Sequence, residues 1–151
     1  IRIETLTGDM PFYGNNDWSD EYSHGFALCS GTFMKFNVGN GNVCSDFSYI
    51  YPQPYLVTEE WMHTLLVVDR EAGKVRFYVD FNLISEGQLN DALDGVPFDG
   101  EDGNIFNIGN DGTGAYADGT LTAEYDDFLV CDGAMTDADV ANLKAYYLGR
   151  K

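Results

Sequence analysis

The dominant pattern in this chain is an alternation of apolar and polar side chains. Residues 33–38 read Phe-Met-Lys-Phe-Asn-Val, and residues 75–80 read Val-Arg-Phe-Tyr-Val-Asp. A period of two predicts β-strands, because successive side chains of a strand point to opposite faces of its sheet. We expect further strands at residues 1–6, 43–49, 61–69, 82–85, 105–108 and 121–131. The glycine-rich turns between them are typical of a sandwich or a barrel.

One segment near the C-terminus has helical spacing instead. Val140, Leu143 and Tyr147 follow at intervals of three and four residues and would share one stripe of a helix. Thr136 and Asp139 form the pattern of a capping box at its start. The sequence therefore predicts an all-β, two-sheet antiparallel β-sandwich with one short C-terminal helix. It contains no repeat or linker, so residues 1–151 are predicted to form a single domain.

The charge of the chain restricts its partners. Among 151 residues, 8 Lys and Arg stand against 25 Asp and Glu, a net charge of −17. Such a charge repels phosphate and anionic lipid, so we expect no nucleic-acid and no membrane partner. Calcium ions and neutral glycans are better candidates. The many glycines and few basic residues favour a secreted or cell-surface protein, and the start at Ile1 favours a domain excised from a larger one.

The cysteines are not expected to form a bridge. Cys29 and Cys44 fall two strands apart and on opposite faces in the predicted register, whereas a disulfide needs Cβ atoms roughly 4 Å apart. The sequence has no Cys-x-x-Cys pair, which argues against a zinc site. We expect all three thiols, Cys131 included, to be buried as small apolar groups.

A turn at residues 70–74 joins two of the strands into a predicted hairpin. Pairing Asp69 with Val75 gives it one apolar face, with Leu65, Val67, Phe77 and Val79. The opposite face then mixes apolar side chains with Arg76 and Tyr78. This composition predicts a sheet surface that is open to solvent and able to contact a ligand.

Three stretches carry motifs in a recognisable order. They are GNNDWSDEYSHGFALC at 14–29, WMHTLLVVDREAGKVRFYVDFNLISEG at 61–87, and NIFNIGNDGTGAY at 104–116 followed by YDDFLVCDGAMTDADVANL at 125–143. Together they resemble the Asp-Trp segment, the central hairpin, and the Asn-Ile-Gly-x-Asp-Gly strand with closing helix of the laminin-G-like, concanavalin A-like jelly-roll domains. Phe81 stands where the family usually has glycine, so we expect the turn there to be built differently.

The resemblance implies a two-sheet jelly roll with a concave face and rim loops. Such modules are typically non-catalytic and accompany hydrolases, lyases or phosphoesterases in secreted bacterial proteins. They bind glycans or another protein, and many hold a calcium ion. Family members commonly have a further strand before the first one seen here; either residues 1–6 fill that role, or that edge strand is missing.

Few residues suggest catalysis. A retaining glycosidase needs two carboxyl groups roughly 5 Å apart, which Glu124 and Asp126 would provide from one strand face. The hydrolases of the resembling family have a longer Glu-x-Asp-x-x-Glu pattern, and Leu129 occupies its last position. His63 is expected to be a hydrogen-bonded core residue, and His24 has no nucleophile partner in the sequence. We predict that the chain is not an enzyme.

Loop oxygens favour a calcium site. Calcium takes about six to eight oxygen ligands from carboxylates, amides and backbone carbonyls. Residues 15–17, 91–102 and 110–111 supply such groups from separate loops. We predict one structural calcium ion, with Asp17 and Asp126 among its ligands.

Aromatic side chains beside polar ones suit carbohydrate, because sugar rings stack on flat aromatic faces. We expect ligand contacts from Tyr78, Arg76 and Asn37 on the open sheet face, from Trp18 and Asp111 on the rim, and from Tyr51 and Tyr55 in the run FSYIYPQPYL. The two prolines of that run would lower the entropic cost of presenting its rings.

The leading hypothesis is a non-catalytic carbohydrate-binding module that targets an attached enzyme to glycans. Its partners would be a glycan or polysaccharide and the remainder of a multidomain protein. One alternative is a calcium-dependent protein-interaction or adhesion module. Another is a structural spacer packed against its parent protein, which an exposed apolar face would mark.

Overall fold

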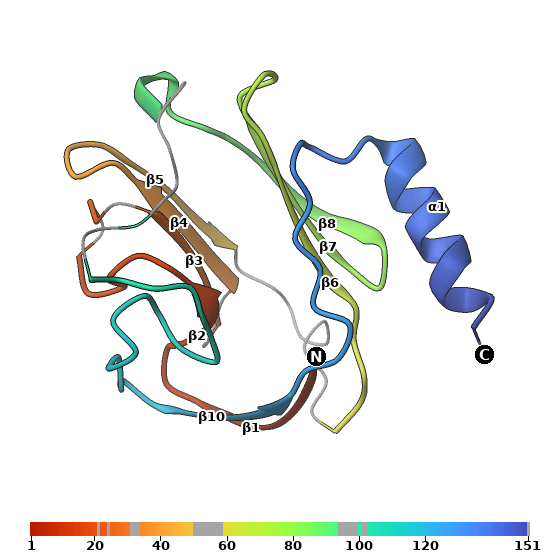
Figure 1. The fold of residues 1–151 in the computed structure, drawn as a ribbon, viewed down its shortest axis with the longest axis horizontal. Coiled ribbons are helices and arrows are strands. Elements are labelled where there is room, and N and C mark those ends of the chain that lie inside the picture. The colour runs from red at the N-terminus through yellow and green to blue at the C-terminus, as the bar shows by residue number, and fades with distance from the viewer. Residues whose placement is uncertain are drawn as a thin grey trace.

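The computed structural model describes residues 1–20, 22–23, 25–30, 34–49, 59–93, 100 and 103–150. This part of the chain is mostly β, with one α-helix close to the C-terminus (Figure 1). Its strands are β1 (Arg2–Thr7), β2 (Met10–Gly14), β3 (Gly25–Ser30), β4 (Met34–Gly39), β5 (Cys44–Tyr49), β6 (Thr64–Asp69), β7 (Lys74–Val79), β8 (Asn82–Gln88), β9 (Asn107–Ile108) and β10 (Thr120–Glu124). A 3₁₀ turn (Asp91–Leu93) follows β8, and the helix is α1 (Asp137–Leu148). No helix in this part of the chain has the length and apolar character needed to cross a bilayer.

The strands form three antiparallel sheets, one more than predicted. The five-stranded sheet has the order β5-β4-β3-β2-β9, the three-stranded sheet has the order β6-β7-β8, and β1 pairs with β10. Figure 1 shows the two larger sheets facing each other, with the β1-β10 ribbon closing one end of the space between them. The predicted β-sandwich with a short C-terminal helix is therefore confirmed, and the ribbon adds a third sheet made from segments far apart in the sequence.

The core lies between the two larger sheets. Phe12, Leu28 and Phe36 of the five-stranded sheet are at most 1% exposed, and Val75 and Phe77 of the three-stranded sheet at most 2%. Full burial of side chains of this size contributes roughly 1.5–3 kcal/mol each. The period-two pattern of the sequence thus identified Phe36, Val75 and Phe77 of this core, but not Phe12, because no strand was predicted at β2.

The predicted register of the β6–β7 hairpin is wrong by one residue. Asp69 pairs with Lys74 and not with Val75. A slip of one residue moves every side chain of a strand to the opposite face of the sheet. Leu65 and Val67 therefore leave the predicted core face and pack on the other side of the hairpin.

Helix α1 covers that other side. Its Val140, 4% exposed, packs with Val67 and Tyr78. The predicted capping box is confirmed, because Thr136 Oγ1 accepts a hydrogen bond from the Asp139 backbone and the Asp139 carboxylate accepts one from the Thr136 backbone. The prediction of an open sheet face around Tyr78 is wrong, since this side chain is only 4% exposed.

The turn after β7 keeps a left-handed backbone without glycine. Asp80 and Phe81 have φ values of 48° and 63°, so Phe81 occupies a left-handed position that glycine adopts more readily. The Phe81 ring stacks on His63 with 4.0 Å between ring centroids. His63 Nδ1 is buried and has no hydrogen-bond partner, which differs from the hydrogen-bonded core histidine predicted from the sequence.

The strand register also accounts for the cysteines. Cys29 pairs with Lys35 and Cys44 with Gly39, so the two cysteines lie opposite well-separated positions of β4. This arrangement agrees with the expectation that they do not bridge. Cys131 is exposed, which contradicts its predicted burial, because the last strand ends earlier than expected.

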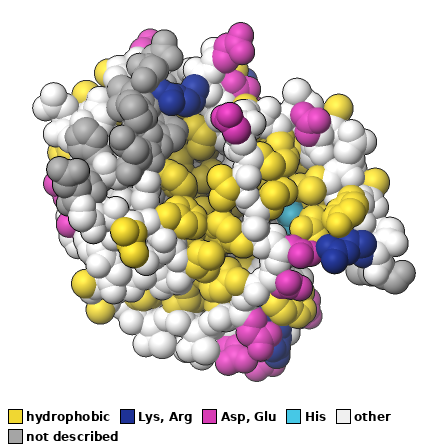
Figure 2. Space-filling model, viewed as in Figure 1, with side chains coloured by type: hydrophobic (Ala, Val, Ile, Leu, Met, Phe, Trp, Pro, Cys, Tyr) yellow, Lys and Arg dark blue, Asp and Glu magenta, His cyan; other side chains and the backbone are white. Residues whose placement is uncertain are grey.

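The last predicted strand, 121–131, is shorter in the structure. β10 ends at Glu124, and Asp127 has a φ of 50° that is incompatible with a regular strand. In the view of Figure 1, the segment beyond β10 passes in front of the space between the two larger sheets. Figure 2 shows hydrophobic side chains gathered in a hollow on this same face.

Candidate functional site

Polar side chains are buried where two loops meet beside the five-stranded sheet. The site comprises Asn16, Asp17 and Trp18 from the loop after β2, Asn37 from β4, and Asp111 from the loop after β9, and we call it the loop junction. Asn16 and Asp111 are 0% exposed and Asn37 is 3% exposed. The structure thus brings together four residues predicted from the sequence, together with Asn16.

Asp111 joins the two loops. Its Oδ2 accepts a hydrogen bond of 2.9 Å from the Trp18 backbone N–H. Its Oδ1 accepts bonds from the Thr113 hydroxyl at 2.7 Å, the Thr113 backbone at 3.1 Å and the Gly114 backbone at 3.2 Å. These four donors compensate for the burial of the carboxylate. Asp111 therefore fixes the position of the Trp18 backbone through the carboxylate that joins the two loops.

Asn16 has one unsatisfied atom. Its Nδ2 donates to Asn37 Oδ1 at 3.0 Å, and its backbone carbonyl accepts a bond of 2.7 Å from Gly112 N. Its Oδ1 is buried without a hydrogen-bond partner. A buried acceptor without a donor costs roughly 1–3 kcal/mol. The loop junction therefore contains a buried oxygen that a bound group would satisfy.

Trp18 lies between the loop junction and the surface. The indole is partly exposed, and its Nε1 donates a long bond of 3.4 Å to Asp9 Oδ2. The same oxygen forms an ion pair of 2.6 Å with Lys35 Nζ, and these two side chains are 19% and 28% exposed. An aromatic ring thus lies next to a pair of opposite charges at the surface.

Asp9 and Lys35 were not predicted from the sequence. Lys35 occupies a polar position in the alternating pattern of β4, a signal that was available. Asp9 reaches it from the turn between β1 and β2, and no local pattern in the sequence indicates this contact.

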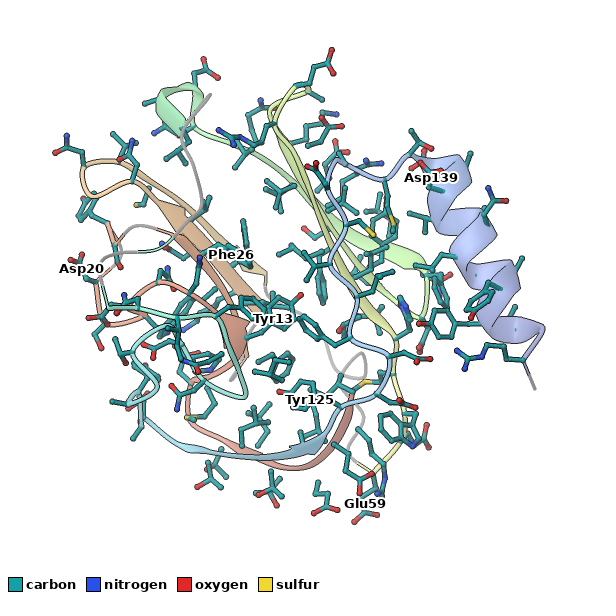
Figure 3. All side chains as sticks on the ribbon, in the orientation of Figure 1. Tyr13, Asp20, Phe26, Glu59, Tyr125 and Asp139 are labelled. Carbon is teal, nitrogen blue, oxygen red and sulfur yellow. The ribbon has the colours of Figure 1, made fainter. Side chains whose placement is uncertain are left out.

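The two predicted metal ligands lie at separate places. Asp17 Oδ1 caps its own turn by accepting a bond of 2.8 Å from Ser19 N. Asp126 Oδ1 accepts a bond from Asp127 N, and its charge acts on the Ile1 amino group, whose pKa is lowered chiefly by burial and raised to a lesser extent by Asp126. Figure 3 shows Asp20 of the first loop and Tyr125 well apart. No three His, Cys, Asp or Glu side chains of the described ranges gather as a metal site.

Arg76 and Tyr78 hold helix α1. Arg76 donates to Asp137 Oδ1 at 2.9 Å and to the Met135 carbonyl at 2.6 Å. The Tyr78 hydroxyl lies 3.3 Å from Arg76 Nη1, and burial raises the pKa of Tyr78. These two residues, predicted to contact a ligand, instead fasten the helix to the sheet. Tyr51 and Tyr55 lie outside the described residues.

The carboxylate pair considered for catalysis does not share a strand face. Glu124 is the last residue of β10 and forms an ion pair of 3.0 Å with Arg2. Asp126 lies beyond the end of the strand. The regular alternation that would bring both carboxylates to one face is therefore lost.

Comparisons with known proteins cover most of the chain. A laminin G family model described as "Concanavalin A-like lectin/glucanases superfamily" matches residues 1–141. Among solved structures, the chain is similar to an S-layer domain-containing protein (residues 221–444) from Clostridium thermocellum ATCC 27405, with 16% sequence identity and a TM-score of 0.40. That match covers 95% of this chain and 66% of the solved one. None of the curated proteins matches the sequence.

Proposed function

Because the chain belongs to the concanavalin A-like lectin/glucanase superfamily, we propose that it is a non-catalytic carbohydrate-binding module with its binding surface at Trp18. The observation that carries this proposal is the partly exposed indole beside the Asp9–Lys35 ion pair. A sugar ring presents C–H groups to an aromatic face and hydroxyls to charged or polar groups. The surface at Trp18 offers both kinds of contact.

The loop junction supports this surface from beneath. Asp111 holds the Trp18 backbone, and Asn16 ties the same loop to Asn37 and Gly112. A ring held in place before binding loses little conformational entropy when a ligand arrives. The buried polar residues therefore act as supports for Trp18, and the ligand contacts come from Trp18, Asp9 and Lys35.

The described residues also favour binding over catalysis. Glu124 forms an ion pair with Arg2, and Asp126 follows the end of β10. His63 is packed against Phe81 and Tyr147, with ring centroids 4.0 Å and 5.2 Å away. None of these side chains lies in an arrangement of acid and base around a common space.

Calcium enters the proposal as a structural ion of the loop junction. Asn16 Oδ1 is a buried neutral oxygen without a donor, and such amide oxygens are calcium ligands. Asp111 fits this role less well, because its carboxylate already accepts four hydrogen bonds. The proposed ligands are Asn16 Oδ1 and loop carbonyls, in place of the pair Asp17 and Asp126.

We further propose that the module belongs to a secreted or cell-surface protein with further domains. It would have no nucleic-acid or membrane partner. The net charge of −17 supports the exclusion of polyanionic partners. A neutral or basic glycan meets no such repulsion.

A glycan array tests this function. The protein would be applied once with calcium and once with a chelator, alongside Trp18→Ala and the matched control Trp61→Ala, whose side chain is 54% exposed. We expect binding to one sugar class that Trp18→Ala abolishes and Trp61→Ala retains. Circular dichroism would confirm that both variants fold. Absence of binding by the folded wild-type protein in both conditions would overturn the proposal.

Loss of binding under chelator alone would place calcium at or beneath the site. Equal binding in both conditions would remove calcium from the proposal and leave the carbohydrate function intact. Equal loss in Trp18→Ala and Trp61→Ala would show that the site is not at Trp18.

A further inference from the structure

Six large apolar side chains are exposed in two segments of the sandwich, one that runs into and through β9 and one that follows β10. We call them the apolar strip. Its members are Ile105, Phe106, Ile108, Phe128, Leu129 and Val130, which are 65%, 41%, 47%, 42%, 59% and 77% exposed. Contiguous exposed apolar surface of this kind marks an interaction site. An exposed apolar face also favours packing against another polypeptide.

The strip is continuous with the aromatic packing beneath it. Phe106 and Phe128 have ring centroids 5.6 Å apart, which brings the two segments into contact. Tyr13 of β2 lies 5.6 Å from Phe128, and Phe26 of β3 lies 6.1 Å from Phe106. Figure 3 shows Tyr13 and Phe26 pointing into the space in front of the five-stranded sheet. The strip is therefore held by the core and is not a loosely attached loop.

The backbone of the apolar strip indicates which backbone conformation a bound partner would have. Residues 128–130 belong to no helix or strand, and their backbone groups have no hydrogen-bond partner within the described part of the chain. Strand β9 is only two residues long and lies at the edge of the five-stranded sheet. Unpaired edges of this kind pair readily with an added extended strand. A helix would leave these backbone groups unsatisfied.

The charges around the strip identify the chemistry of the occupant. Asp126 and Asp127 precede Phe128, and Asp132 follows the strip; all three are exposed. Only Asp127 has an ion-pair partner among the described residues, Arg150 at 2.7 Å. A second copy of this chain would bring another net charge of −17 to the same face. Lys and Arg are therefore the favoured flanking residues of a partner.

We propose that the apolar strip accepts an extended β-strand from another polypeptide, with alternating apolar side chains and basic residues at its ends. The apolar side chains would cover the strip, and the strand backbone would pair with residues 128–130. Lys or Arg would lie beside Asp126 and Asp132. This surface shares no residue with the one proposed at Trp18 and does not depend on the carbohydrate function.

The first test uses a synthetic ten-residue peptide of alternating Val and Thr with two Lys at each end. Its controls are the same peptide with Asp at the ends and a version with N-methylated alternate residues, which cannot donate backbone hydrogen bonds. We expect saturable binding of the Lys peptide to the full chain and at least about tenfold weaker binding of each control. No saturable binding of the Lys peptide would overturn the proposal.

The second test locates the peptide. Leu129→Ser and Val130→Ser remove exposed side chains, so the fold is retained, and Leu83→Ser, at a residue 52% exposed on β8, is the matched control. We expect the first two variants to weaken binding at least about tenfold and the control to leave it unchanged. Hydrogen exchange at residues 128–131 should slow when the peptide binds. Equal affinity in all three variants, or dimers of the wild-type chain that Leu129→Ser dissolves, would contradict the proposed partner.

Discussion

Two places in the described part of this protein hold polar side chains in opposite ways. At the loop junction, Asp111 is fully buried and accepts its hydrogen bonds mainly from loop backbone. Under helix α1, Arg76 is 13% exposed while its partner Asp137 is 91% exposed. The first is a closed network that fixes two loops, and the second is a half-open attachment of a helix. Residues of both places were predicted to contact a ligand. Residue type alone therefore does not tell whether a polar side chain fixes two loops, as Asp111 does, or attaches a helix, as Arg76 does.

The largest effect should come from breaking the closed network. Asp111→Ala would leave the backbone N–H of Trp18 and the turn donors around Thr113 without an acceptor. We expect a loss of roughly 2–4 kcal/mol in the free energy of unfolding, measured by urea denaturation. Asp118→Ala, at an exposed position in the segment before β10, is the matched control and should change stability by less than about 0.5 kcal/mol. Equal stability of the two variants would show that Asp111 does not hold the loops.

Breaking the half-open attachment should cost less. Arg76→Met keeps most of the apolar stem but removes the hydrogen bonds to Asp137 and to the Met135 carbonyl. Because Asp137 is well solvated, we expect a loss of roughly 1–2 kcal/mol. Hydrogen exchange should accelerate in α1 and remain unchanged in the five-stranded sheet. Acceleration spread evenly over both would show that the helix does not detach as a separate unit.

The same comparison shows what the sequence can predict. The strand that the alternation predicted here, found at Met34–Gly39, and the capping box at Thr136 follow from local patterns, and both were confirmed because they depend on neighbours in the chain. The register of β6–β7 was predicted wrongly because two turns that differ in length by one residue allow the same apolar residues to form the two strands. The cover over Tyr78 was missed because it comes from Val140, more than sixty positions away.

The loop junction was predicted in part for a similar reason. Acidic and amide residues such as Asp17 and Asp111 indicate a polar loop cluster from the sequence alone. Their burial, and the contact of Trp18 with Asp9 and Lys35, depend on how the turn after β1 and strand β4 meet in space. No periodicity carries that information.

A smaller effect is expected at the turn beside the helix attachment. Phe81 has a left-handed backbone, which costs a residue other than glycine roughly 1 kcal/mol. Its ring also stacks on His63, a contact worth roughly 0.5–1.5 kcal/mol. Phe81→Gly removes both, so we expect a net change within about 1 kcal/mol in urea denaturation. A loss of several kcal/mol would mean that Phe81 holds the helix through Tyr147 as well, whose ring lies 6.1 Å away.

The smallest effect distinguishes the two regions by pH. The pKa of His63 is lowered by burial first and then by the Ile1 amino group, while Asp80 opposes the shift. The unfolded chain therefore binds a proton at His63 more readily than the folded chain. The contribution of His63 to the free energy of unfolding is therefore fully present above the ordinary histidine pKa of about 6.5. It decreases as the pH falls below that value. The loop junction has no histidine among its described residues, so this dependence belongs to the region beside the helix.

Urea denaturation at pH 7.5 and pH 5.5 measures this difference above the range where most carboxylates titrate. The wild-type chain should be less stable at pH 5.5, and His63→Gln, which stays neutral, should lose much of that dependence. Local exchange should show the acid effect at the turn after β7 and in α1 before it reaches the strands around Asp111. If His63→Gln retains the full pH dependence, the proton is taken up elsewhere, and the stack of His63 on Phe81 does not make the helix side of the sandwich sensitive to acid.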